Sequence, residues 1–155
     1  VKRVLESHRP GEIYIPYEHD MPADHKATYR IVLGAAGCLD AVTVFEYPVW
    51  FWFHWPWVPY PLNNRRDLPA IVRDNIRSIR RLLTHFTTAV DIRGRVDDKK
   101  HALDAYESQM TRLGGDPEWP RLQDVADGDF LNLFFQDHEL FRESLVAGDG
   151  RQRYL

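Results

Sequence analysis

The chain has 155 residues, a formal net charge of −3 and one cysteine, Cys38. This length suits one domain or a large part of one, and a hydrophobic content of 44% argues against a disordered chain. The near-balance of acidic and basic residues argues against a nucleic-acid partner. A lone cysteine excludes an intramolecular disulfide and a multi-cysteine zinc site, and it suits a reducing compartment, so we expect a cytoplasmic location.

Strand and helix patterns alternate along the chain. After a helical start at residues 1–6, which has no capping residue before it, the sequence predicts strands at 12–16, 41–47 and 87–92 and helices at 24–37, 67–85 and 97–113, with a last helical region at 129–145. This alternation predicts an α/β, Rossmann-like layered fold with a mainly parallel sheet. The uncapped start suggests that the fold is incomplete at the N-terminus, in a chain cut from a longer one.

The helix at 67–85 is expected to be amphipathic. Its buried stripe is predicted to consist of aliphatic residues: Ile71, Val72, Ile76, Ile79, Leu82 and Leu83. The arginines lie away from this stripe, on a face expected to be solvated: Arg73, Arg77, Arg80 and Arg81. The most apolar window, 45–60, is interrupted by Glu46, His54 and several prolines, so we expect no membrane span.

A dense group of polar side chains follows the first predicted strand. Residues 17–25 contain Tyr17, Glu18, His19, Asp20, Asp24 and His25. In layered α/β folds, ligands bind where strands end and loops lead into helices. An imidazole there can bind zinc, and a neighbouring carboxylate can orient it. The alternative is structural, with Asp24 as a helix N-cap and His25 as an ordinary first-turn residue.

A zinc site would be incomplete on these residues alone. Catalytic zinc usually takes three protein ligands and a water, whereas the loop offers His25 and either His19 or Asp20. Elsewhere the sequence contains no closely spaced histidine pair of the usual metal-binding kind. Either there is no metal, or the other ligands lie outside these 155 residues.

Two segments carry a resemblance to a known family. Residues 15–27, Ile-Pro-Tyr-Glu-His-Asp-Met-Pro-Ala-Asp-His-Lys-Ala, resemble the second signature of the LmbE-like, or PIG-L, deacetylases, in which a strand and a polar loop ending in His-Pro-Asp-His precede a helix. The second match is Val90-Asp91-Ile92 followed by a helix with Lys99, Lys100, Ala102, Leu103, Tyr106, Ser108 and Gln109. The two matches occur in the family's order.

The resemblance implies a zinc-dependent hydrolase that removes the acetyl group from an N-acetylglucosamine-type sugar or its conjugate. His25 would be a zinc ligand, Asp24 would orient the catalytic machinery, and zinc-activated water would attack the acetyl carbonyl. The family's first signature, Ala-His-Pro-Asp-Asp, with two ligands and the general base, is absent from the sequence. Residues 1–155 are therefore expected to be the C-terminal part of one such domain, inactive alone.

The second signature also departs from the family pattern. Pro22 and Ala23 stand where the family has His-Pro, so the role of that histidine would pass to His19, with Asp20 beside it. An imidazole that titrates near neutral pH can protonate a leaving amine or stabilise an oxyanion. The alternative is that His19 is a solvated loop residue.

An aromatic, proline-broken segment occupies residues 47–57 and holds four of the five tryptophans. Trp50 and Trp52 are candidates for stacking on a sugar, with Tyr17 and Asp20 as further substrate contacts. The structural alternatives are core packing or an interface in a homo-oligomer. A second functional hypothesis is a non-catalytic relative that binds carbohydrate through residues 47–57.

Overall fold

The computed structural model describes residues 1–53 and 68–155, and the chain divides into two compact units. The first, which we call the sheet unit, comprises Val1–Phe51, Arg77–Ala89 and Leu140–Leu155. The second, which we call the helical unit, comprises Trp52–Ile76 and Val90–Glu139.

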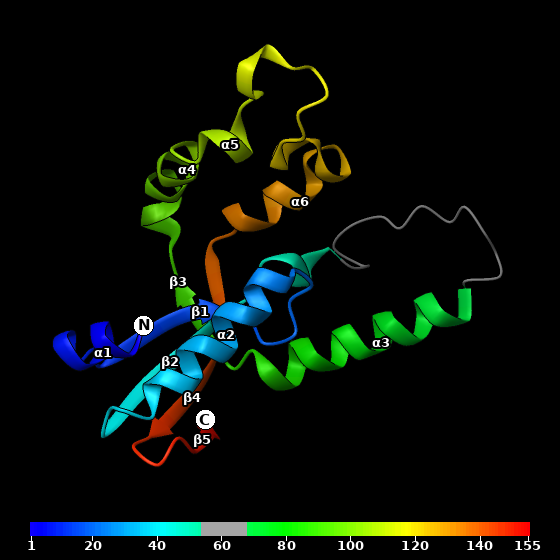
Figure 1. The fold of residues 1–155 in the computed structure, drawn as a ribbon. Helices are drawn as coiled ribbons and strands as arrows, with labels where there is room; N and C mark the ends of the chain where they lie inside the picture. Colours follow the sequence, from blue (N-terminus) through cyan, green and yellow to red (C-terminus); the bar gives the residue numbers. More distant parts are fainter. Residues whose placement is uncertain (54–67) are drawn as a thin grey trace. The chain divides into compact units, whose positions relative to one another are not determined.

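The sheet unit is built on one strand–helix–strand unit (Figure 1). Strand β1 (Glu12–Pro16) leads into helix α2 (Ala23–Ala36), which returns the chain to strand β2 (Ala41–Tyr47). The two strands are parallel, and a parallel pair needs such a helical crossover. These three elements confirm the strands predicted at 12–16 and 41–47 and the helix predicted at 24–37, which begins one residue earlier.

The rest of the sheet differs from the prediction. Strand β4 (His138–Ala147) pairs antiparallel with β2, and β5 (Gln152–Tyr154) pairs antiparallel with β4. The order of the four-strand path is β1-β2-β4-β3, where β3 is Thr88–Asp91, close to the strand predicted at 87–92. The fold is α/β with a mixed sheet, and a mainly parallel sheet is not confirmed.

The helical region predicted at 129–145 is wrong over its second half, which forms β4. The residues of β4 that face the interior are Arg142, Ser144 and Val146, each buried, and they recur with the two-residue period of a strand. Two of these three are polar. The strand therefore lacks a run of alternating apolar residues, and Leu140, Phe141 and Leu145 together suggest helical spacing.

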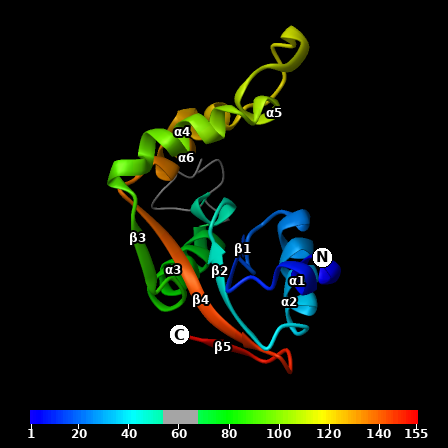
Figure 2. The same cartoon turned by 90° about the vertical axis from the view of Figure 1, so that its left-hand side faces the viewer.

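The apolar core of the sheet unit lies between its strands and two helices, α1 (Lys2–His8) and α2. Figure 2 shows both helices together on one side of β1 and β2. The core consists of Leu5, Ile15, Tyr29, Ala36, Leu39, Val42, Val44 and Val146, with Cys38 packed against it. On β2, alternate residues Val42, Val44 and Glu46 are buried, so a glutamate continues the core face toward the carboxyl end of the strand.

Helix α3 (Leu68–His85) has the predicted length, but its expected buried stripe is not confirmed. Val72, Ile76 and Leu83 are exposed, and Ser78 is the buried residue. Ile79 and Leu82 are half-buried. Asp67 and the side chain of Ile71 lie outside the part of the chain that the structure describes. An amphipathic pattern shows which face a helix can bury, and whether another element covers that face depends on tertiary structure.

The helical unit contains α4 (Val96–Asp104), α5 (Glu107–Met110) and α6 (Asp129–Asn132). The single helix predicted at 97–113 is divided at Tyr106, whose ψ of 67° is not helical. The interior centres on fully buried Phe130, whose ring contacts Phe53 and Phe134 edge-on. In the described parts of the chain, no helix is both long enough and apolar enough to cross a membrane.

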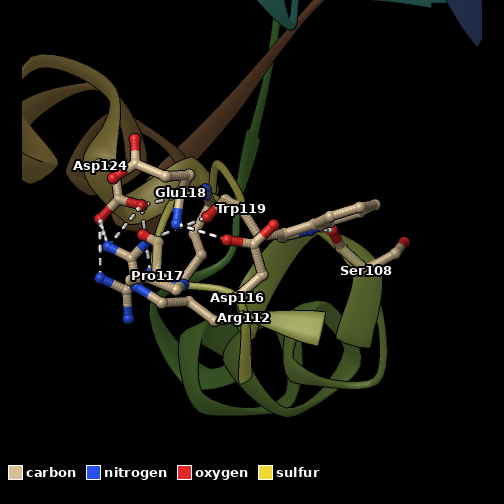
Figure 3. A network of polar contacts seen from close by, with 8 residues as sticks. Ser108, Arg112, Asp116, Pro117, Glu118, Trp119 and Asp124 are labelled. Atoms are coloured by element: carbon tan, nitrogen blue, oxygen red, sulfur yellow. Dashed lines mark hydrogen bonds and ion pairs between the residues drawn. The ribbon is translucent and has the colours of Figure 1, made fainter. Parts of the chain in front are cut away.

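A polar network fixes the segment between α5 and α6 (Figure 3). The Arg112 guanidinium donates to the backbone carbonyls of Pro117 and Trp119 and forms an ion pair with Asp124 at 3.3 Å. The indole N–H of Trp119 donates to the carbonyl of Ser108 at 2.9 Å. One arginine thus holds a segment that has little regular secondary structure.

Candidate functional site

The candidate site lies at the carboxyl ends of the parallel strands β1 and β2. The loop at 17–22 follows β1, and the short helical turn η1 (Trp50–Trp52) follows β2. Fully buried Asp20 links the two segments. Its carboxylate accepts hydrogen bonds from the backbone N–H groups of Trp50 at 3.1 Å and Phe51 at 2.6 Å. This anchors the loop before α2 begins.

The same carboxylate orients His25, which lies in the first turn of α2. Nδ1 of His25 is 2.7 Å from Oδ2 of Asp20, and the His25 side chain is 20% exposed. An ionised carboxylate only accepts hydrogen bonds, so Nδ1 carries the proton and a neutral ring keeps its lone pair on Nε2. This is the tautomer that a metal-binding histidine needs, with a carboxylate behind the ring.

Asp24 does not make this contact. It is exposed in the first turn of α2, and the helix has no side-chain cap hydrogen bond, so the N-cap alternative is not seen, while the orienting role of Asp24 toward the catalytic machinery remains a prediction. Asp20 orients His25 instead. Pro22, which directly precedes the helix, has an extended backbone.

The other predicted substrate contacts divide into two groups. Tyr17 and Asp20 are fully buried, so the structure gives them packing and hydrogen-bonding roles in place of the predicted contact with a sugar. Trp50 and Trp52 are half-buried, and their predicted contact with a sugar remains a prediction. Trp55 and Trp57 lie outside the described residues.

His19 lies beside a different carboxylate from the one expected. Its Nε2 is 3.7 Å from Oε2 of Glu18, whereas Asp20 is engaged with His25. Burial lowers the pKa of His19, the positive charge of Arg81 lowers it further, and Glu18 opposes the change. His19 is therefore neutral at physiological pH, with its side chain 35% exposed.

A buried ion pair that the sequence pattern did not predict lies behind this loop. Glu46 on β2 lies directly opposite Arg142 on β4 in the antiparallel register, with 3.7 Å between their charged groups. Nη1 of Arg142 also pairs with Glu18 at 3.0 Å, and the guanidinium stacks 3.6 Å from the centre of the Tyr154 ring. Arg142 thus joins a core carboxylate to the one beside His19.

Burial raises the pKa of Glu46 to about 6, although the backbone N–H of Glu18 and the charge of Arg142 pull it down. A connected set of hydrogen bonds surrounds this carboxylate. The Gln152 amide donates to Glu46 and to Ser144, and its carbonyl oxygen accepts from the hydroxyls of Tyr29 and Tyr154. The polar core beneath the loop is therefore fixed by partners on α2, β2, β4 and β5.

No cluster of three or more histidine, cysteine, aspartate or glutamate side chains suited to a metal occurs within residues 1–53 and 68–155. Comparisons with protein-family models, with curated proteins and with solved structures found no match for this chain.

Proposed function

We propose that this chain is the C-terminal part of a metal-dependent N-deacetylase domain that acts on an N-acetylglucosamine-type sugar or its conjugate. The observation that carries the proposal is the Asp20–His25 pair at the carboxyl ends of two parallel strands. The resemblance of residues 15–27 and 90–109 to the LmbE-like deacetylases supports it further.

Zinc fits His25 as one ligand. The ring offers Nε2 while a buried carboxylate holds Nδ1, which is the usual arrangement behind a metal-bound imidazole. The remaining ligands and the general base are expected from outside these 155 residues. When bound, zinc lowers the pKa of a coordinated water toward about 7 and polarises the acetyl carbonyl.

The chain's own residues would supply orientation and proton transfer. Asp20 fixes the ring of His25 and ties it to the turn after β2. His19, neutral and partly exposed beside Glu18, would receive the proton that the general base takes from water and pass it to the leaving amine nitrogen as the carbon–nitrogen bond breaks. Arg142 holds Glu18 in place for this step.

The test is acetate release from N-acetylglucosamine by the longer protein that contains this chain, with zinc content measured in parallel. We expect His25→Ala to abolish activity and lower zinc content, and His19→Ala to slow turnover by about 10²–10⁴-fold with zinc retained. His101→Ala, at an exposed position on α4, is the matched control. The 155-residue chain alone should release no acetate.

Full activity and zinc content in His25→Ala would reject the assignment. Sugar binding without acetate release in the unmodified longer protein would favour the non-catalytic carbohydrate-binding alternative. If His19→Ala retains turnover within a few-fold, His19 is a solvated bystander and another group protonates the amine.

A further inference from the structure

A buried tyrosine holds a second histidine beside His19. Tyr17 is fully buried, and its hydroxyl lies 2.7 Å from Nδ1 of His85, the last residue of α3. The Tyr17 ring packs against Phe51 and Phe86. These contacts fix the position of the phenol. Tyr17 and His85 are 68 residues apart in sequence.

The direction of this hydrogen bond follows from the partners available. Burial raises the pKa of Tyr17 far above neutral, so the phenol keeps its proton. Among the described residues, His85 is the hydrogen-bond partner of that hydroxyl. If Nδ1 were the donor, the buried O–H would lack an acceptor, at a cost of about 1–3 kcal/mol. The phenol thus donates to Nδ1.

The second nitrogen of His85 must then carry the ring proton. Burial lowers the pKa of His85, and the positive charges of Arg142 and Arg81 and the neighbouring His19 lower it further, while Glu18 opposes them. A neutral imidazole whose Nδ1 accepts a hydrogen bond has its proton on Nε2. Half-buried His85 is thus a hydrogen-bond donor of fixed tautomer.

We propose that His85 is a ligand-binding residue whose Nε2–H donates a hydrogen bond to a hydroxyl or carbonyl oxygen of the sugar bound beside His19. The two imidazole rings are 6.1 Å apart between centroids, a separation that one pyranose ring or its acetamido group spans. The sugar class rests on the proposed function, while the tautomer of His85 rests on the Tyr17 contact alone. A neutral donor suits an uncharged ligand rich in acceptor oxygens.

The first test is the imidazole nitrogen NMR spectrum of the 155-residue chain at neutral pH, with His85 assigned by its absence in His85→Gln. We expect the Nε2–H tautomer, and a mixture of both tautomers in Tyr17→Phe. Tyr14→Phe, which removes an exposed hydroxyl bonded to Glu12, should leave the signal unchanged. An Nδ1–H tautomer or a protonated ring in the unmodified chain would overturn the proposal.

The second test measures the dissociation constant for N-acetylglucosamine in the longer protein. We expect His85→Phe to weaken binding about tenfold and His85→Gln, which retains an N–H donor, to stay within about threefold. His8→Phe, exposed at the end of α1, is the control. Unchanged binding in His85→Phe, or no binding in the unmodified protein, would overturn the ligand assignment. If the longer protein binds the sugar and His85 has the expected tautomer but no acetate is released, the deacetylase assignment fails and the role of His85 stands.

Discussion

Replacing Glu46 by glutamine should change how the stability of the sheet unit depends on pH. The side chain is fully buried, and its pKa is raised from 4.5 to about 6 because desolvation exceeds the pull of Arg142 and the Glu18 N–H. The folded state therefore binds the Glu46 proton more tightly than the unfolded state does. Glu46 contributes stability below pH 4.5, and this contribution is lost as the pH rises through about 6.

The size of the effect follows from the raised pKa. Each pKa unit corresponds to about 1.4 kcal/mol, so ionised Glu46 costs the folded chain about 2 kcal/mol above pH 6. Glutamine has the same shape and does not titrate. The quantity to compare is the free energy of unfolding of Glu46→Gln minus that of the unmodified chain. Between pH 4 and pH 7.5 this difference should shift by about 2 kcal/mol in favour of Glu46→Gln.

Urea unfolding followed by circular dichroism at pH 4, 5, 6 and 7.5 measures this difference directly. Glu107→Gln, which removes an exposed carboxyl on α5, controls for the loss of one negative charge. A difference between Glu46→Gln and the unmodified chain that stays constant across this range would refute the argument. A difference that changes in the opposite direction would mean that Arg142 outweighs desolvation.

Other side chains give equally direct expectations. Arg142→Met leaves Glu18 and Glu46 without their shared cation and should lower the free energy of unfolding in urea by about 3–5 kcal/mol. Adding Glu46→Gln should restore part of that stability. If the effects of the two substitutions simply add in the double variant, the pairing is contradicted. Arg112→Ala should speed amide hydrogen exchange across residues 108–124 while leaving β1 and β2 protected; unchanged exchange there would show that Arg112 does not hold the segment.

The elements that sequence predicts well are those with a complete local signal. Strand β2 alternates apolar residues with a two-residue period, and its bounds at 41–47 were predicted correctly. The same alternation places Glu46 on the buried face with Val42 and Val44, so a core carboxylate was detectable. Its partner Arg142 was not, because the register of β2 with β4 is a tertiary property and β4 itself resembled a helix.

The sequence predicted where the candidate site lies in the fold better than it predicted which side chains are in contact there. The loop at 17–22 and His25 in the first turn of α2 lie at the carboxyl end of β1, as the strand–loop–helix pattern indicated. The family resemblance gave the orienting role to Asp24, yet α2 exposes Asp24, and Asp20, which accepts from the backbone of the turn at 50–52, contacts His25. His85 reaches Tyr17 across 68 residues, a contact that no local pattern encodes.

The central claim is that Asp20 presents His25 as a metal ligand, and zinc affinity of Asp20→Asn in the longer protein tests it most directly. The Asp20 carboxylate accepts from Nδ1 of His25 and from two backbone N–H groups, whereas asparagine has one acceptor oxygen and no charge, so it no longer holds the Nδ1–H tautomer that leaves Nε2 for the metal. With circular dichroism confirming the fold, we predict zinc binding about 10–100-fold weaker than in the unmodified protein. Equal affinity in the folded variant would contradict the account.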